Sequence, residues 1–187
     1  MTIERMLYFL RNTARIAVIS ITLSLNAEMI YDFRKDSKMN AWTVVDDGVM
    51  GGRSSGVLQL SKDGFGIYSG FISLDNYGGF SSIRLNIGKL MVQDFTHIVL
   101  RIKGDNKIYQ LRIRADYNDR HVYSKSFFAD SEWGLIEVPM KEMMPQFRGR
   151  RLMMENFNKN HIVELGILIG NKVRENFNLE IDYIKLK

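Results

Sequence analysis

Hydrophobic and polar residues alternate with a period of two along most of the chain beyond its N-terminal segment. Near residue 100, Ile98, Leu100 and Ile102 would face one way while Arg101 and Lys103 face the other. Such alternation predicts β-strands with one face in a core and the other in water. Further strands are expected at residues 29–33, 57–60, 65–73, 83–87, 108–115, 121–128, 135–139, 162–169 and 177–183.

Two of these segments also indicate which side chains share a face. In residues 108–115 the apolar positions Tyr109, Leu111 and Ile113 oppose the polar positions Gln110, Arg112 and Arg114. In residues 177–183 the apolar set that we expect on one face is Phe177, Leu179, Ile181 and Tyr183. Both segments therefore predict strands that are buried on one side only.

Turn signals separate the predicted strands, at residues 62–64, 104–106 and 117–119. About ten short strands without a long amphipathic helix predict an all-β, antiparallel sandwich or barrel. The one helical candidate, Met140–Met144, is ended by Pro145, and residues 148–160 show no clear period, which indicates a loop or short helix. Nothing marks a domain boundary, so residues 28–187 are expected to form a single domain.

Residues 1–27 have the features of a targeting segment. Arg5, Arg11 and Arg15 form a basic region, residues 16–25 are an apolar stretch, and the small residue Ala27 suits the position before a cleavage site. Ten apolar residues are too short for a ~30 Å hydrocarbon core, so no stable membrane span is expected. A secretory signal, an organelle presequence and a retained extension stay open. Cleavage implies a periplasmic or exported protein, and retention a cytoplasmic one.

Composition excludes several kinds of chemistry. The 187 residues include 26 Lys and Arg, 21 Asp and Glu, three His and no Cys, with a net charge of +5. Residues 1–27 hold three Arg and one Glu, so the remainder carries +3, too little to indicate a nucleic-acid partner. The absence of Cys excludes thiol catalysis and Cys-ligated metals, and His97, His121 and His161 form no local metal motif. No cofactor is expected.

Nine of the fifteen glycines lie between Gly48 and Gly79, and seven of these fall in two blocks, residues 46–56 and 70–82. The first block is not a phosphate loop, because the residues after it predict a strand and no Lys follows its last glycine. The glycines instead suit turns with positive φ and close approaches of the backbone.

The two blocks carry a family resemblance. Trp42 followed by residues 45–54 (VDDGVMGGRS), and then residues 76–84 (NYGGFSSIR), closely resemble the signature of the complex I intermediate-associated protein 30 family. The resemblance continues through residues 100–105, 133–149, 165–169 and 177–184, and so covers roughly residues 29–187.

That resemblance implies a galactose-binding-like jelly-roll β-sandwich, which agrees with the period-two pattern. It also implies a chaperone-like role, because mitochondrial members of the family are assembly factors that hold partly built respiratory complex I. Plant relatives carry the module in chloroplast proteins, and bacterial members are mostly without assigned function. Respiratory-complex assembly intermediates are therefore one expected class of partner.

Several residues are candidates for a binding or catalytic role. Trp42 would either stack on a sugar ring or anchor the glycine loop, and Trp133 suits core or edge packing. Asp46 and Asp47 are candidate acid and base groups of a hydrolase, although neighbours on an extended segment point in opposite directions. The alternative is that both carboxylates cap amides of the glycine loop.

Other candidates depend on how the strands are ordered. Asp32 and Asp182 are conceivable Ca²⁺ ligands, although no metal site is the main expectation. Six basic residues on polar strand faces would form a stripe if the strands were neighbours: Arg84, Arg101, Lys103, Arg112, Arg114 and Lys125. Ser54, Ser55, Ser81 and Ser82 lie in no nucleophile elbow.

These observations lead to three function hypotheses. The first is a non-enzymatic binding module that holds a protein partner, the second a carbohydrate-binding module of the cell envelope, and the third a hydrolase using Asp46 or Asp47. An exported protein could not act on the cytoplasmic arm of complex I. The candidate partner- or ligand-binding residues are Trp42, Asp46, Asp47, Met50, Gly51, Gly52, Arg53, Ser54, Gly78, Gly79, Phe80, Arg101, Tyr109, Arg112 and Arg114.

Overall fold

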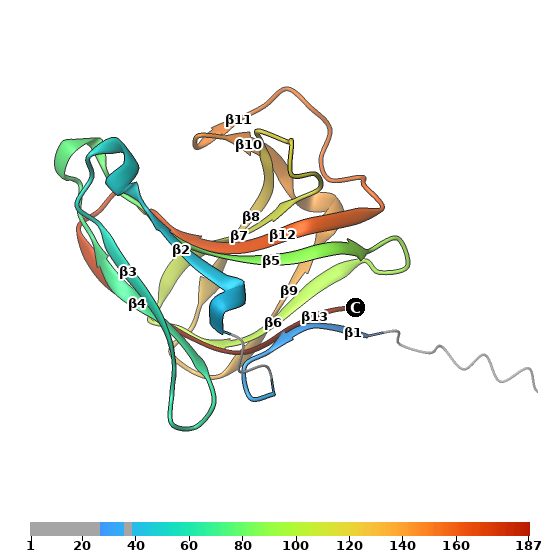
Figure 1. Ribbon diagram of the computed structural model, residues 1–187, viewed down its shortest axis with the longest axis horizontal. Coiled ribbons are helices and arrows are strands. Elements are labelled where there is room, and N and C mark those ends of the chain that lie inside the picture. Colours follow the sequence, from blue (N-terminus) through green and yellow to red (C-terminus); the bar gives the residue numbers. More distant parts are fainter. Residues whose placement is uncertain (1–26, 36–38) are drawn as a thin grey trace, which may run out of the picture.

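The computed structural model describes residues 27–35 and 39–187, so the targeting segment predicted for residues 1–27 lies almost entirely outside the described residues. The described residues form two antiparallel β-sheets that face each other, with short 3₁₀ turns between strands (Figure 1). The prediction of an all-β sandwich is confirmed.

Sheet A has six strands. Its hydrogen-bonded order is β3 (Ser55–Leu60), β4 (Gly66–Ile72), β13 (Glu175–Leu186), β6 (His97–Lys103) and β9 (Gly134–Pro139), and β1 (Glu28–Asp32) also pairs with β13.

Sheet B has seven strands. Its order is β11 (Arg150–Arg151), β10 (Met144–Phe147), β8 (Val122–Ala129), β7 (Lys107–Arg114), β12 (His161–Ile169), β5 (Ser81–Met91) and β2 (Trp42–Asp46). The 3₁₀ turns are η1 (Met39–Ala41), η2 (Asp47–Met50), η3 (Asp75–Tyr77) and η4 (Met140–Glu142).

The core fills the space between the two sheets. Alternate residues of β7 are buried, and the inward-facing residues of β6 and β12 pack with them, among them Leu100, Leu111 and Ile167, each fully inaccessible. The other residues of β7 and β12 therefore point away from sheet A, which places Arg112 and Gly166 on the outward face of sheet B.

The prediction that Tyr183 shares the face of Phe177, Leu179 and Ile181 is wrong, because β13 contains a bulge. The register of β13 against β6 shifts between Ile181 and Tyr183, and an extra residue at a bulge reverses the side on which later residues lie. Ile184 and Leu186 are consequently fully buried, whereas Tyr183 is only partly buried. Periodicity alone cannot reveal such a shift.

Residues 140–151 also differ from the expectation. The predicted helix at Met140–Met144 is only the single turn η4, and β10 follows it even though this strand contains Pro145. Arg148 and Gly149 adopt positive φ angles of 50° and 73° and turn the chain into β11. The segment predicted as loop or short helix thus begins with a β-hairpin. Within the described residues, no helix has the length and apolar character needed to cross a membrane.

Candidate binding site

Asp47 holds the two glycine blocks together. Its side chain is fully buried and accepts hydrogen bonds from the backbone N–H of Ser54 at 3.0 Å and from the Ser54 hydroxyl at 2.5 Å. The backbone N–H groups of Gly79 and Phe80, which lie in the second block, donate to the same carboxylate at 2.6 and 3.2 Å. One carboxylate therefore fixes η2 and its following loop against the loop after η3.

The glycines beside Asp47 are required by space. A Cβ atom on Gly52 would lie 2.2 Å from Asp47 Oδ1, and one on Gly78 would lie 2.6 Å from Asp47 Oδ2. Gly51 has a φ of 85°, and its carbonyl accepts a hydrogen bond from the Asn76 side chain at 2.9 Å. The blocks are glycine-rich because the backbone must close tightly around a buried anion.

Hydrogen bonds keep Asp47 ionised despite its burial. Burial acts to raise the pKa of Asp47, but the bonds from Ser54, Gly79 and Phe80 outweigh it, and the pKa lies below its usual value of 3.8. Asp46 is also engaged, by the Gly56 N–H at 3.0 Å and the Ser81 hydroxyl at 2.5 Å. Asp47 binds amides and a hydroxyl of the loops, and Asp46 binds residues at the start of β3 and β5, which contradicts the use of either one as the acid or base of a hydrolase.

Trp42 lies in the core and not on the surface. Its side chain packs edge-on against Tyr31, with ring centroids 5.4 Å apart, and stacks on Phe33 at 5.6 Å. With an exposed fraction of 7%, it offers no face on which a sugar ring could stack. Trp133 packs beside Phe65 and beneath Arg101, as edge packing predicts.

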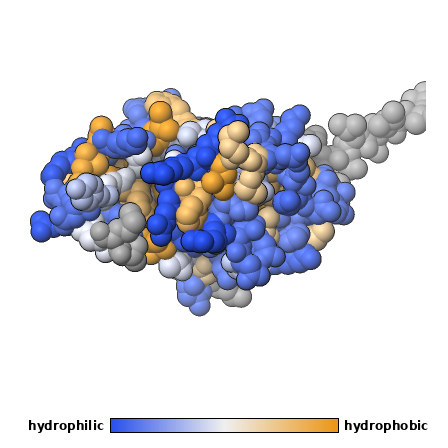
Figure 2. Space-filling view, turned by 90° about the horizontal axis from the view of Figure 1, so that it is seen from above, coloured by the Kyte–Doolittle hydropathy of each residue, from blue (hydrophilic) through white to orange (hydrophobic). Residues whose placement is uncertain are grey.

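The outward face of sheet B is hollowed into a groove of about 660 Å³. Its floor is formed by β5, β12, β7 and β8, one rim by the loop after η3, and the other by the turn between β10 and β11 (Figure 1). Figure 2 looks onto this side of the molecule and shows strongly hydrophilic residues gathered around its middle, with apolar residues beside them. The groove is larger than a second pocket of about 380 Å³, which Val92, Met140 and Phe157 help to line.

The groove is rich in basic side chains. Six basic residues border it: Arg84, Arg112, Arg114, Arg120, Arg148 and Lys172. The only acidic residue among its lining residues is Glu164. Arg114 is partnered, because its Nη1 donates to the Asp119 carbonyl at 2.9 Å and its Nε lies 3.4 Å from Glu164.

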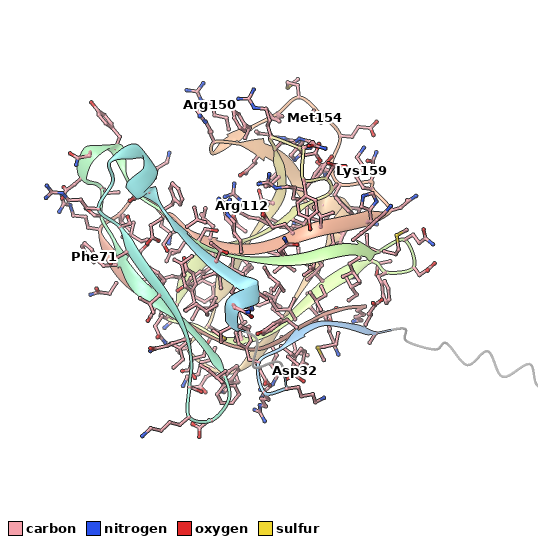
Figure 3. The ribbon with its side chains drawn as sticks, in the orientation of Figure 1. Asp32, Phe71, Arg112, Arg150, Met154 and Lys159 are labelled. Atoms are coloured by element: carbon pink, nitrogen blue, oxygen red, sulfur yellow. The ribbon has the colours of Figure 1, made fainter. Side chains whose placement is uncertain are left out.

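Arg112 stands at the centre of the floor (Figure 3). Its Nε is buried and has no hydrogen-bond partner among the described residues. Burial, with repulsion from Arg84 and Arg114, lowers the pKa of Arg112 to about 10, and Glu164 acts in the opposite direction. The guanidinium therefore stays charged at neutral pH in a partly dehydrated position.

The predicted basic stripe is split between the two sheets. Arg84, Arg112 and Arg114 share the groove, whereas Arg101 and Lys103 lie on β6 of sheet A. Lys125 pairs with Glu142 at 2.6 Å, and its register partner on β7 is the buried Leu111, so it does not face the groove. Alternation within a strand cannot show which sheet the strand joins.

Asp182 and Asp32 are neutralised by basic side chains. Asp182 receives Arg34 Nε at 2.8 Å and Arg101 Nη1 at 2.5 Å. Asp32 lies 3.3 Å from Lys35 Nζ and accepts the backbone N–H of Arg34 at 3.1 Å. Basic side chains already compensate the charge of both carboxylates, so the arrangement does not favour a bound Ca²⁺ ion.

The other predicted residues are dispersed. Tyr109 is fully buried and donates its hydroxyl to Asp105 at 3.0 Å, so it belongs to the core. Gly78, Gly79 and Phe80 line the groove. Arg53 is exposed on the loop after η2, and the side chain of Met50 lies outside the described residues.

Several residues that line the groove were not among the candidates identified from the sequence: Gln110, Arg120, Phe147, Arg148, Glu164 and Gly166. Several of them occupy the polar positions of alternating strands, which was a usable signal. Their convergence depends on the order β8-β7-β12-β5, in which strands distant in sequence become neighbours. Phe147 is covered by two guanidinium groups, those of Arg120 and Arg148, at 5.2 and 5.4 Å from its ring.

Comparison with protein families gives one match over most of the chain. A family model described as "Complex I intermediate-associated protein 30" matches residues 31–181. The chain is 23% identical over 185 residues to "Complex I intermediate-associated protein 30, mitochondrial" from Drosophila melanogaster, covering 86% of this chain and 62% of the relative. For the Mus musculus protein of that name, identity is 24% over 182 residues, with 84% and 55% covered. The chain thus spans less than two thirds of these relatives.

Comparison with solved structures supports the jelly-roll fold. A "Family 11 Carbohydrate-Binding Module" of a Clostridium thermocellum cellulase matches with a TM-score of 0.66 and 18% identity, covering 86% of this chain and 94% of the module. A second structure of a family 11 module, determined "in complex with beta-1,3-1,4-mixed-linked tetrasaccharide", has a TM-score of 0.63, 17% identity and the same coverage. At such identity the likeness concerns the fold alone.

Proposed function

Because the chain belongs to the complex I intermediate-associated protein 30 family, we propose that it is a non-catalytic, chaperone-like module that holds a protein partner in the groove on sheet B. The observation that carries the proposal is a groove whose floor is made of sandwich strands and whose rim is fixed by Asp47. A site built on rigid elements binds without first ordering itself, which reduces the cost of association.

The class of partner is supported by the names of the curated relatives, which are complex I intermediate-associated proteins of mitochondria. Assembly intermediates of a respiratory complex are accordingly the first partners to test. Cleavage after Ala27 would make the protein periplasmic or exported, and its partner would then be an envelope protein.

The proposed cleavage leaves the sandwich complete. β1 begins at Glu28, which pairs with Leu186 of β13, so cleavage removes no residue of the strands that the structure describes. Mass spectrometry of the protein purified from its own cells decides the compartment. A mature N-terminus at Glu28 supports export, and an intact Met1 contradicts it.

Partner capture from native cells tests the groove itself. Gln110→Trp places a bulky side chain on the groove floor, whereas Gln59→Trp places the same side chain on the exposed part of β3, outside the groove. We expect wild type and Gln59→Trp to recover the same proteins, and Gln110→Trp to lose a specific subset. Identical recovery from all three proteins would contradict the proposal, provided that circular dichroism shows each to be folded.

A carbohydrate ligand is the second candidate function. It is favoured by Tyr77, an aromatic residue at one rim of the groove that is 98% exposed. A glycan array separates the two candidates. Binding of a glycan that Gln110→Trp abolishes and Gln59→Trp preserves would favour the carbohydrate function, and no binding above background would remove it.

A further inference from the structure

The groove contains an unbalanced cluster of positive charge at its centre. Arg84 and Arg112 have no ion pair with any carboxylate among the described residues, in contrast to Arg114. Several basic residues on strand faces outside the groove are matched with acids, as in Arg101 with Asp182 and Lys125 with Glu142. Arg84 and Arg112 differ from these in lining a groove without such a partner.

Glycine opens a trough between the two unpaired arginines. Gly166 of β12 pairs with Arg84 on one side and with Arg112 on the other. Neighbouring strands lie ~4.8 Å apart, so the two arginine backbones stand about 10 Å apart with no side chain between them. An anionic group above Gly166 would have a guanidinium on each side, and each guanidinium can offer it paired N–H donors.

Without a ligand, the environment of the Arg112 side chain is energetically unfavourable. Arg112 is partly dehydrated, lies among like charges, and keeps a buried Nε without an acceptor. Burial of an unpaired charge is unfavourable, and an incoming anion relieves it by supplying both countercharge and acceptor. Positive charge at this position in the groove therefore favours the binding of an anionic group.

We infer that the groove binds an extended acidic segment of a protein, with a carboxylate seated above Gly166 between Arg84 and Arg112. The inference rests on the proposed function and names the chemistry of the partner. In an extended peptide, alternate side chains lie on one side about 6.7 Å apart, so acidic residues at every second position can all face the arginines. Arg120, Arg148 and Lys172 at the rims extend the positive field along the segment.

Two observations favour a peptide over an acidic glycan. Sugar rings bind best against free aromatic faces, yet Phe147 is already covered by Arg120 and Arg148. Trp42 lies in the core, and Trp133 packs against Phe65, outside the groove lining. The groove is therefore richer in groups that bind carboxylates than in surfaces that bind sugar rings.

Fluorescence anisotropy with defined probes tests the inference. The probe is a labelled peptide of alternating Glu and Ser, about ten residues long, which spans ~33 Å when extended. A peptide with Gln in place of Glu and an oligogalacturonate of equal charge serve as comparison ligands. Each is titrated with the full chain as wild type, Arg112→Gln, Arg84→Gln and Lys62→Gln, the last removing a positive charge from the exposed turn between β3 and β4.

We expect the Glu peptide to bind, and the Gln peptide to bind at least tenfold more weakly. Arg112→Gln and Arg84→Gln should each weaken Glu-peptide binding roughly 10- to 100-fold, as loss of a charge-assisted hydrogen bond does, while Lys62→Gln changes it less than about threefold. Binding should also weaken between about 0.01 M and 0.15 M salt, as the Debye length falls from ~30 to ~8 Å.

Three results would overturn the inference: equal binding of the Glu and Gln peptides, an equal effect of Arg112→Gln and Lys62→Gln, or tighter binding of oligogalacturonate than of the Glu peptide. Its failure is distinguishable from failure of the proposed function. If Gln110→Trp abolishes partner capture and Arg112→Gln does not, the groove holds a protein partner but does not recognise it through carboxylates of that partner.

Discussion

Replacement of Asp47 by alanine removes the buried carboxylate that binds backbone N–H groups of both glycine blocks. Four hydrogen bonds are lost at once, two from Ser54 and one each from the backbone N–H groups of Gly79 and Phe80. The donors remain in place, and those of Ser54 are buried. The change therefore leaves unsatisfied polar groups and does not simply delete a surface charge.

The expected cost follows from those bonds. A hydrogen bond to a charged group contributes at least about 1.5 kcal/mol, so four give a gross loss of roughly 6 kcal/mol. The buried carboxylate was itself costly to dehydrate, and water entering the space will satisfy some donors. We expect the free energy of unfolding to fall by about 3–5 kcal/mol, because each buried donor left unsatisfied costs roughly 1–3 kcal/mol. This is a large share of the ~5–15 kcal/mol that stabilises an ordinary domain.

Urea unfolding followed by circular dichroism measures the loss. Asp94→Ala, at an exposed turn, is the control and should change the free energy of unfolding by less than about 0.5 kcal/mol. Because the folded pKa of Asp47 lies below its unfolded value of 3.8, its ionic contribution is fully present above pH 3.8. The difference in the free energy of unfolding between wild type and Asp47→Asn should therefore become smaller as the pH falls through the pKa of Asp47 in the folded protein. A loss below about 1 kcal/mol for Asp47→Ala would refute the assigned role.

Three other substitutions test separate parts of the structure by the same unfolding assay. Gly52→Ala should lower the free energy of unfolding by about 1–3 kcal/mol, because its Cβ would lie 2.2 Å from Asp47 Oδ1. Gly48→Ala, with open space around it, should lower it by less than about 0.5 kcal/mol. Equal effects of the two substitutions would contradict the close approach of Gly52 to Asp47. Trp42→Ala should cost about 3–5 kcal/mol as a core deletion, and a near-neutral effect would place its ring at the surface. Arg112→Met should leave the free energy of unfolding unchanged or raise it by up to ~1 kcal/mol, because it removes a dehydrated charge; a loss above ~1 kcal/mol would show that Arg112 is structural.

The period-two pattern predicted the fold well because each sheet has one buried face. It placed Leu111 and Arg112 on opposite sides of β7, as the structure does. It failed at Tyr183, where a bulge inserts a residue, and at β10, where Pro145 masked a strand. Bulges and proline-containing strands are settled by neighbouring strands, which local sequence does not specify.

The candidate site was predicted only in part, for a similar reason. The alternative role of Asp46 and Asp47, in which both carboxylates bind loop amides, followed from the local glycine pattern and is what the structure shows. The groove was not predictable, because Arg84, Arg112 and Gly166 meet only through the strand order β7-β12-β5. Charge on a strand face becomes a site when the topology of the sheet brings such faces together.

Photo-crosslinking from the groove floor in native cells tests the central claim most directly. A photoreactive amino acid replaces Gln110, which lines the groove, or Gln59, which is exposed on β3. If the groove holds a protein partner, illumination should join position 110 to a discrete protein, position 59 should not form that product, and Arg112→Gln should reduce it. Crosslinking of the same proteins with equal yield from both positions, or of none from position 110, would contradict the account.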